Sequence, residues 1–333
     1  MDPNLCLDGQ HELLNSSLEL APGTISCARP TRGKARLELQ RSQQVCEHMT
    51  TSGRLSLAAQ PILGGAVVKA LFDLTDRVAV VTGAGGGLGT AICEGLATYG
   101  ADVALMDLDR DALAASAAGV ERQGRRALLL DSDASDDTAV QQAFRRVDDT
   151  FGKLDILVNL AYTPTFGKPE DLSLADWHKA LRINLTSYFL CCQQAGRRMI
   201  AQGRGGAIMN MCSIAGTSAL GRGNYPYSVS KGGVVMMTKE LAVEWAKYGI
   251  RVNAIQPCQF LTPGLRYRLD DPELGPQIRQ KFLAGIPLNR LGEPAEMVGP
   301  VLFLVSEAAA MVTGVLLPVD GGNLALNAGG TRD

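Results

Sequence analysis

Short runs of apolar or β-branched residues alternate with longer helical segments along the chain from Asp76 onward. These runs lack the polar alternation of a strand that has one face in water. Apolar strands that alternate with helices are typical of a parallel sheet covered on both faces. The pattern predicts strands at residues 77–82, 102–107, 126–131, 154–159, 206–212, 250–256 and 315–319. We therefore expect a doubly wound α/β fold, with a seven-stranded parallel sheet in a single domain.

The expected domain covers residues 73–325, and the chain before it differs in character. Residues 1–72 show no sustained helical or strand period, so they cannot bury enough apolar surface to offset the entropy lost on ordering. We predict a poorly structured N-terminal extension, although residues 55–72 contain enough apolar side chains for a short helix. Met49 lies inside this extension and is a candidate start of translation. Residues 1–48 are therefore interpreted as a non-native leader or as the result of an alternative start upstream of Met49. Residues 326–333 are predicted to form a C-terminal tail.

Composition argues against several classes of protein. A net charge of −2 and an aromatic content of 5% do not indicate binding to nucleic acid or to an anionic membrane surface. The eight cysteines show no CxxC pair and no metal-ligand spacing, so we expect reduced thiols, a cytoplasmic protein and no metal site. Residues 297–319 are apolar enough for a membrane span. Pro300, Glu307 and Gly314 favour instead a buried helix followed by a buried strand.

A glycine-rich turn, Thr82-Gly-Ala-Gly-Gly-Gly-Leu-Gly89, follows the first predicted strand and opens a helix. Glycines let the backbone approach a pyrophosphate, and the free N–H groups of a helix N-terminus attract its charge. Glycine clusters are common in loops, but this position at the first strand-to-helix junction favours a dinucleotide site. The predicted contacts are Gly83, Gly86, Gly87, Leu88 and Gly89.

Asp107 ends the second predicted strand. A carboxylate at this position can accept hydrogen bonds from the adenosine ribose and repel a 2′-phosphate. The residue before Gly87 is Gly86 rather than a cation, and both features favour NAD over NADP. Arg110 lies close in sequence and weakens this preference. The alternative is that Asp107 only caps the next helix.

Tyr227 and Lys231 lie four residues apart, which places them one turn apart on the same face of a helix. A free phenol has a pKa near 10, and a neighbouring cation favours the phenolate. Lowering the pKa by about three units requires roughly 4 kcal/mol of differential stabilisation. We expect Lys231 to supply it, so that Tyr227 can exchange a proton near neutral pH.

Two further polar residues accompany this pair. Ser213 follows the fifth predicted strand and can polarise a substrate carbonyl by hydrogen bonding. Asn184 lies in the long helix between the fourth and fifth strands. Taken singly, Ser213 could be a turn cap and Asn184 a solvent-facing amide. Their order along the chain, together with Tyr227 and Lys231, favours a catalytic group.

These motifs resemble the short-chain dehydrogenase/reductase family, both in the TGxxxGxG spacing of the turn and in the four residues Asn184, Ser213, Tyr227 and Lys231. The resemblance covers nearly all of residues 75–322 and implies a Rossmann-type fold, an NAD or NADP cofactor and a homotetramer. It implies that Tyr227 is the general acid/base and that Lys231 also reaches the nicotinamide ribose. It further implies that Asn184 distorts its helix and holds a water that relays protons to the lysine. Additional cofactor contacts implied by the resemblance are Asp133, Ala134, Asn159, Ala161, Pro257 and Thr262.

The chain departs from the family pattern at two places. Where the family usually has Asn-Asn-Ala-Gly after the fourth strand, this chain has Asn159-Leu-Ala-Tyr162. Where the family usually has Pro-Gly after the sixth strand, this chain has Pro257-Cys258. Tyr162 is expected to narrow the mouth of the cofactor groove or to line the substrate pocket. Cys258 is interpreted as a small filler residue, with reactivity toward thiol reagents as the alternative.

The resemblance implies an NAD-dependent oxidoreductase that interconverts a secondary alcohol and a ketone, with a sugar acid or polyol as substrate. Gluconate 5-dehydrogenase is typical of this subgroup. An NADPH-dependent 3-oxoacyl-acyl-carrier-protein reductase is the first alternative, which Asp107 and Gly86 disfavour. A non-catalytic NAD-binding scaffold or sensor is the alternative of another class. Residues 263–285 are expected to form a mobile lid, where Arg266 and Arg268, with Arg222 nearby, either pair with an anionic substrate or stay solvated.

Overall fold

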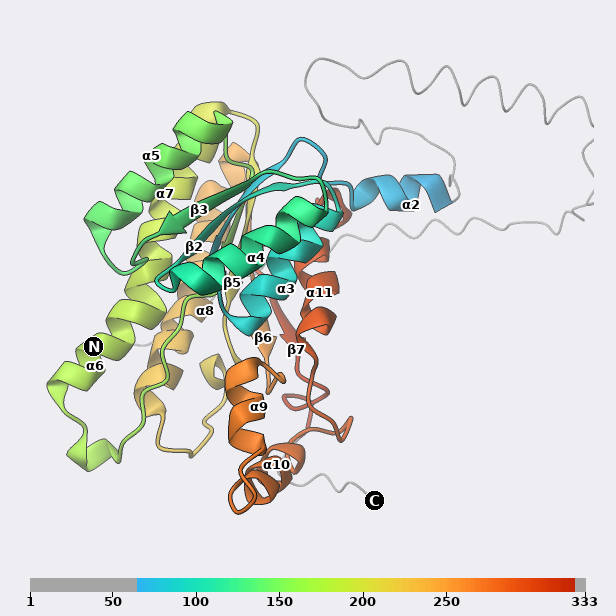
Figure 1. Ribbon diagram of the computed structural model, residues 1–333. Helices are drawn as coiled ribbons and strands as arrows, with labels where there is room; N and C mark the ends of the chain where they lie inside the picture. The colour runs from blue at the N-terminus through green and yellow to red at the C-terminus, as the bar shows by residue number, and fades with distance from the viewer. Residues whose placement is uncertain (1–64, 327–333) are drawn as a thin grey trace, which may run out of the picture. The chain divides into compact units, whose positions relative to one another are not determined.

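The computed structural model describes residues 65–326, which contain one parallel sheet of seven strands in the order β3-β2-β1-β4-β5-β6-β7 (Figure 1). All six strand pairings are parallel. The strands are β1 (Val78–Thr82), β2 (Asp102–Asp107), β3 (Ala127–Asp131), β4 (Ile156–Asn159), β5 (Gly206–Met211), β6 (Ile250–Pro257) and β7 (Leu316–Val319). The predicted seven-stranded doubly wound fold is therefore confirmed.

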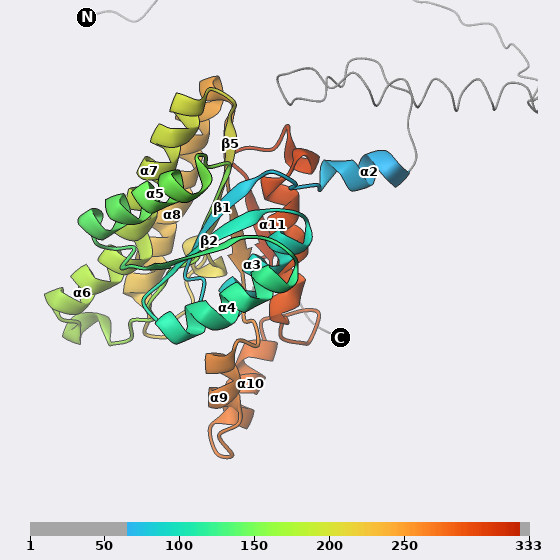
Figure 2. The ribbon, with the colours of Figure 1, turned by 45° about the horizontal axis from the view of Figure 1, so that its top comes forward.

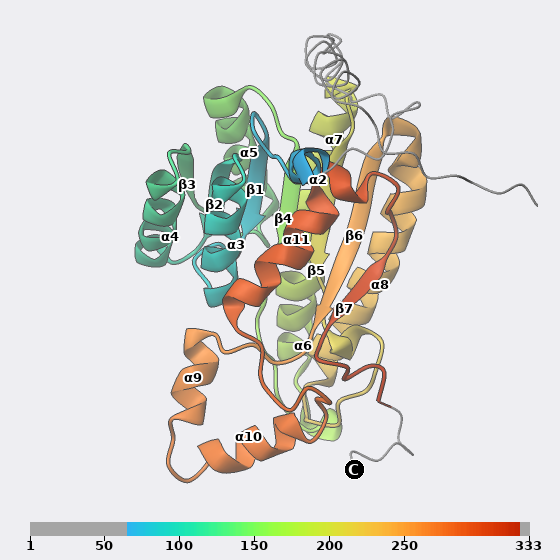
Figure 3. The ribbon, with the colours of Figure 1, turned by 90° about the vertical axis from the view of Figure 1, so that its right-hand side faces the viewer.

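Helices cover both faces of the sheet (Figure 3). The longer ones are α2 (Gly65–Leu71), α3 (Gly87–Thr98), α4 (Arg110–Arg122), α5 (Asp137–Phe151), α6 (Leu174–Leu181), α7 (Ser187–Gln202), α8 (Tyr225–Trp245), α9 (Pro263–Leu269), α10 (Gly275–Leu283) and α11 (Val298–Val305). One core joins α3, α4 and α11 to one face of the sheet, and a second joins α5, α7 and α8 to the other. Helices α9 and α10 project from the body after β6 (Figure 2).

Strand β1 lies where the order of the sheet reverses. It pairs with β2 on one side and with β4 on the other, and all five of its residues are buried. In an open α/β sheet, ligands bind beyond the carboxyl ends of the strands at such a point, because the connections leave in opposite directions there. Thr82, Asp107 and Asn159 end the three strands and mark this edge.

Parts of the sequence predictions fall outside the described residues. The interpretation of residues 1–48 as a leader lies there, as does nearly all of the predicted tail, since residues 327–333 are not described. Within the extension, residues 65–71 form helix α2, inside the segment for which a short helix was allowed.

The apolar stretch 297–319 forms α11 and then β7. The expectation that this strand is buried is wrong, because β7 is an edge strand and Pro318 is exposed. A proline has no N–H to donate, which suits the open side of an edge strand. Within residues 65–326, none of the helices has the length and apolar character needed to cross a bilayer.

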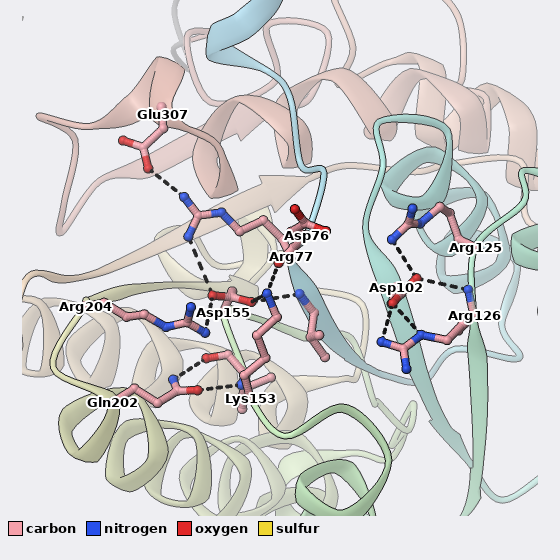
Figure 4. Close-up of polar contacts among 12 residues, drawn as sticks. Asp76, Arg77, Asp102, Arg125, Arg126, Lys153, Asp155, Gln202, Arg204 and Glu307 are labelled. Carbon is pink, nitrogen blue, oxygen red and sulfur yellow. Dashed lines mark hydrogen bonds and ion pairs between the residues drawn. The ribbon is translucent and has the colours of Figure 1, made fainter. Parts of the chain in front are cut away.

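Buried carboxylates hold the amino ends of the strands, at the edge opposite the site (Figure 4). Asp155 precedes β4 with a side chain that is 4% exposed, and its Oδ2 accepts a hydrogen bond of 2.9 Å from the Val78 N–H of β1. Its charge is balanced by Arg204 at 3.1 Å, Arg77 at 3.6 Å and Lys153 at 3.7 Å. The buried carboxylate thus links β1, β4 and the start of β5, with partner cations whose side chains are 26% to 43% exposed.

We expect Asp155→Ala to lower the free energy of unfolding by about 2 to 4 kcal/mol, because it removes a buried charged acceptor and leaves a backbone donor and three cations without it. Urea denaturation followed by circular dichroism measures the change. Glu307→Ala is the matched control, since Glu307 also pairs with Arg77 but is 58% exposed. It should cost about 1 kcal/mol or less. Equal losses for the two variants would contradict the assignment.

Candidate active site

The glycine turn connects β1 to α3 at a spacing that only glycine permits. Gly83 has a φ of +68°, in the left-handed region. A Cβ on Gly89 would lie 2.1 Å from the Gly83 carbonyl oxygen. Helix α3 begins at Gly87 with no side-chain cap at its N-terminus. The first turn therefore presents backbone N–H groups to whatever lies beyond the sheet edge.

The start of α9 lies directly against this turn. A Cβ on Gly87 would be 2.6 Å from Pro263 Cδ and 3.1 Å from Thr262 Cβ. Thr262 is the N-cap of α9, and its side chain accepts from the Leu265 N–H at 3.4 Å. The structure therefore brings together two predicted cofactor residues, Gly87 and Thr262. Gly86 is different, because a Cβ there would meet only the Gly83 oxygen at 3.4 Å, so space remains above it.

Asp107 points back into the glycine turn. Its Oδ2 accepts a hydrogen bond of 2.9 Å from the Gly85 N–H, and its Oδ1 accepts from the Leu108 N–H at 2.8 Å. The cap of α4 is Asp109, whose side chain accepts from Asp111 and Ala112. The alternative in which Asp107 only caps the next helix is therefore not what the structure shows. Its carboxylate therefore lies next to the glycine turn, where it can accept a hydrogen bond from a ligand bound at that turn.

Asp133 and Ala134 follow β3 at the same edge. Asp133 Oδ1 accepts from the Ser135 N–H at 2.8 Å and from the Ser135 hydroxyl at 2.6 Å, while Oδ2 lies 3.4 Å from Arg182. Burial raises the pKa of Asp133, but these hydrogen bonds and the arginine outweigh it and lower the pKa below its usual value. The carboxylate is therefore charged and fixed. Ala134 is buried with 8% exposure.

Asn159 faces the core rather than the groove. It is 0% exposed, and its Nδ2 donates to Asn210 Oδ1 at 2.9 Å and to Cys192 Sγ at 3.3 Å. Its Oδ1 is buried without a partner among the described residues. These contacts correspond to a core amide between β4, β5 and α7, so the predicted cofactor contact of Asn159 gains no support. Neighbouring Ala161 is half-buried and Tyr162 is 64% exposed.

Asn184 lies in a π-helical segment, Arg182–Thr186, between α6 and α7. Such a segment inserts one residue into a helix and is frequent at functional sites. The Asn184 side chain is 0% exposed, and it accepts from the Thr163 N–H at 2.8 Å and donates to the Thr163 carbonyl at 3.0 Å. The helix distortion expected from the resemblance is present. The amide is not solvent-facing, and it holds the loop after β4.

Ser213, Tyr227 and Lys231 converge at the carboxyl end of β5. Ser213 caps the short helix that follows, with its hydroxyl accepting from the Ala215 N–H at 3.1 Å, and it also hydrogen-bonds Tyr227. Lys231 is 1% exposed and its Nζ lies 5.7 Å from the centre of the Tyr227 ring. Pro257 ends β6 beside them and is buried. The turn-cap interpretation of Ser213 and the catalytic one are thus both compatible with its contacts.

The expected lowering of the Tyr227 pKa is not found in the protein alone. Burial raises the pKa of Tyr227 well above its usual range, opposed by the Ser213 hydrogen bond and increased by Cys212 and Tyr162. The Lys231 amine donates to the Met211 carbonyl at 2.8 Å and to the Tyr188 hydroxyl at 3.0 Å, and among the described residues it is not a cause that lowers the pKa of Tyr227. Burial also lowers the pKa of Lys231 to about 8, with Cys212 opposing the shift.

Comparison with known proteins agrees with this arrangement. The sequence model of a family described as enoyl-(acyl carrier protein) reductase matches residues 83–323. D-threitol dehydrogenase from Mycolicibacterium smegmatis is 42% identical over 253 residues, which cover 75% of this chain and 94% of that protein. NAD-dependent glycerol dehydrogenase from Listeria innocua is 39% identical over 251 residues, which cover 75% and 95%. The structure of NAD+-bound xylitol dehydrogenase has a TM-score of 0.70 at 33% identity, over 75% of this chain and 99% of that one.

The chain belongs to the short-chain dehydrogenase/reductase family.

Membership in the short-chain dehydrogenase/reductase family confirms the resemblance carried by the glycine turn and by Asn184, Ser213, Tyr227 and Lys231. It makes the chain an oxidoreductase that acts on CH–OH groups and uses NAD(P).

Three contacts in this short-chain dehydrogenase/reductase chain were not foreseen from the sequence. Tyr188, fully buried on α7, contacts Lys231, although nothing in its spacing indicated this. The other two contacts involve arginines that the sequence offered either as partners of an anionic substrate or as solvated charges. Arg266 pairs with Glu293 at 2.6 Å, and Arg222 stacks 5.0 Å from the Phe282 ring of α10. Arg266 therefore already has an anionic partner inside the protein.

We expect Gly89→Ala to abolish nicotinamide dinucleotide binding and to lower the unfolding free energy by about 1 to 3 kcal/mol, because the added methyl group overlaps the Gly83 carbonyl. Titration with NADH followed by fluorescence and urea denaturation measure the two effects. Gly299→Ala is the matched control in the first turn of α11, where a Cβ meets nothing within 4 Å. It should leave binding unchanged and stability the same or up to about 1 kcal/mol higher. Normal binding by the Gly89 variant would refute the close-approach argument.

Proposed function

We propose that the protein is an NAD-dependent dehydrogenase that oxidises a secondary alcohol of a small polyol or sugar-type substrate. The observation that carries the proposal is the convergence of Ser213, Tyr227 and Lys231 at the end of β5, beside the groove bordered by the glycine turn. The names of the similar proteins support the substrate class, since they describe dehydrogenases of threitol, glycerol and xylitol.

The residues present fit a dinucleotide. The uncapped first turn of α3 would hold the pyrophosphate, since its N–H groups and the space above Gly86 suit an anion. Asp107 would accept hydrogen bonds from the adenosine ribose. Asp133 and Ala134 would lie near the adenine, and Thr262 near the nicotinamide carboxamide. When bound, the oxidised nicotinamide accepts a hydride from the substrate carbon.

The protein itself moves the proton. Ser213 donates a hydrogen bond to the substrate oxygen and orients it toward Tyr227, which removes the hydroxyl proton during oxidation and returns it during reduction. Because burial raises the pKa of Tyr227, the phenolate needs added positive charge, and Lys231 is the nearest described cation. Asn184 fixes the loop that carries Tyr162 beside Tyr227.

The alternatives of the sequence interpretation have less support. A 3-oxoacyl-acyl-carrier-protein reductase that uses NADPH would place a 2′-phosphate against the carboxylate of Asp107. A non-catalytic scaffold would have no need of a buried amine and phenol together, because burying both costs free energy. We keep the alcohol dehydrogenase as the proposal.

We further propose a homotetramer in the cytoplasm, with residues 73–325 as its catalytic domain. Large apolar side chains are exposed on the outer faces of two adjacent helices, and the open edge at β7 supplies a second surface. The four residues are Phe189 on α7 and Val229, Met236 and Val243 on α8.

The five cysteines in the described part of the chain are free thiols, which suits a reducing compartment.

Tyr227→Phe should lower kcat by at least about 100-fold, because the ring stays but the proton acceptor is lost. A panel of threitol, glycerol and xylitol, assayed by the absorbance of NADH, supplies the substrate. Binding of NADH should stay within about threefold of the parent protein, which separates lost chemistry from lost folding. Tyr248→Phe is the control, since Tyr248 is 40% exposed at the far end of α8. Turnover within about tenfold of the parent protein for Tyr227→Phe would rule out the mechanism.

The cofactor preference should depend on Asp107. Its carboxylate would repel the 2′-phosphate of NADP, at a cost of a few kcal/mol in a partly desolvated groove, or a factor of about 100 or more in affinity. Asp107→Ser should therefore lose NAD affinity and gain NADP use only modestly, with Arg110, three residues along the chain, as a cation that could improve it. The measurement is kcat/KM for both cofactors. Asp109→Ser removes an adjacent charge but keeps a good N-cap for α4, so it should not change the preference. A parent enzyme that favours NADP would overturn the assignment.

A further inference from the structure

The amine of Lys231 is held by two oxygens on the side of the site away from solvent. Its Nζ donates to the Met211 carbonyl at 2.8 Å and to the Tyr188 hydroxyl at 3.0 Å. Lys231 is 1% exposed and Tyr188 is 0% exposed. An ammonium has three donors, so these two oxygens leave one N–H of Lys231 without an acceptor among the described residues.

The hydroxyl of Tyr188 is oriented by its own donation. It gives its proton to the Met211 carbonyl at 3.0 Å, so a lone pair of the phenol oxygen faces the amine. The carbonyl has two lone pairs and can accept from both groups. Tyr188 is the second residue of α7, directly after the π-helical segment that contains Asn184. The extra residue of that segment sets which side of α7 faces α8, and it brings the phenol to Lys231.

We propose that Tyr188 is a positioning residue for Lys231, whose hydroxyl oxygen anchors the amine at the end of β5, behind Tyr227. This inference rests on the proposed function, in which the charge of Lys231 supports the phenolate of Tyr227. Tyr188 does not touch the substrate. It fixes where the ammonium stands and supplies an acceptor that a neutral amine does not need.

The groups around the amine leave this role to Tyr188. From α7 the amine faces Tyr188, from the end of β5 the Cys212 thiol, and from its own helix Tyr227. Burial raises the pKa of Cys212, and burial together with Tyr227 raises that of Tyr188 well above its usual range, so both stay neutral. Among the described residues, no carboxylate forms an ion pair with Lys231. Hydrogen bonds to Tyr188 and Met211 are therefore what hold the charged form in place.

The test is a direct titration of Lys231 in the protein without substrate. Protein carrying ¹³C- and ¹⁵N-labelled lysine is followed by NMR, with the Lys231 signal assigned by its loss in Lys231→Met. The parent midpoint is expected at about 8. In Tyr188→Phe it should fall by about one pH unit or more, because a hydrogen bond to the charged form is lost while the ring remains. The alkaline limb of kcat/KM should move down by a similar amount.

Thr238→Val is the matched control. Like Tyr188, Thr238 carries a fully buried hydroxyl, but it lies on α8. This hydroxyl accepts from Asn210 on β5 and donates to the Val234 carbonyl of its own helix, so it does not contact Lys231. This variant should leave the Lys231 midpoint unchanged. An unshifted or raised midpoint in Tyr188→Phe, or an equal shift in both variants, would overturn the proposal.

The parent protein provides a second measurement in case Tyr188→Phe does not fold. A buried, hydrogen-bonded ammonium exchanges its protons slowly, so a Lys231 NH₃⁺ signal should be visible below the midpoint, and its absence would also count against the anchor. None of these titrations needs turnover. If no alcohol is oxidised but the midpoint shifts, the proposed function fails while the anchoring of Lys231 by Tyr188 stands.

Discussion

The close approach of α3 to the end of β1 is the constraint from which the site follows. The backbones of Gly83 and Gly89 lie too close together there for a Cβ to fit between them, since a Cβ on Gly89 would lie 2.1 Å from the Gly83 oxygen. The contact aims the N-terminus of α3 across the carboxyl edge of the sheet and leaves its first N–H groups without internal partners. It also lets Thr262 and Pro263, at the start of α9, lie directly against Gly87. A larger residue at either glycine would move all of these parts together.

The two edges of the sheet use polar groups in opposite ways. At the amino edge, Asp155 and Asp102 are surrounded by cations, and hydrogen bonds and charges from Arg125 and Arg126 lower the pKa of Asp102 despite its burial. At the carboxyl edge, the N-terminus of α3 has no side-chain cap for its first N–H groups. Among the described residues, Lys231 has two hydrogen-bond acceptors for its three N–H donors. The paired edge stabilises the sheet, which allows the other edge to hold groups that are costly to bury.

The sequence predicted the parts of this protein that depend on local pattern. Strand positions followed from apolar runs, the turn from its glycines, and the constellation from the order of Asn184, Ser213, Tyr227 and Lys231. What it missed depends on distances between elements. The side chain of Asn159 lies in the core, where its amide donates to Asn210 on the next strand, and the predicted cofactor contact of Asn159 stays a prediction. The edge position of β7 is set by the sheet order. The contact of Tyr188 with Lys231 could not be predicted, because it forms only when α7 packs on α8.

The interpretation of Tyr227 shows why spacing alone cannot give a pKa. Four residues along a helix bring phenol and amine to one face, and from that the phenolate was expected to be favoured. In the folded chain both groups are desolvated, and desolvation opposes charge on each, raising the pKa of Tyr227 and lowering that of Lys231 to about 8. As pH rises, the first proton to leave this pair is therefore the one on the amine. An amine that has lost its proton no longer stabilises the phenolate, so the pair can support proton removal only while something keeps Lys231 charged. In the proposed mechanism, the two acceptors of the amine, Met211 and Tyr188, are therefore as necessary as the phenol of Tyr227.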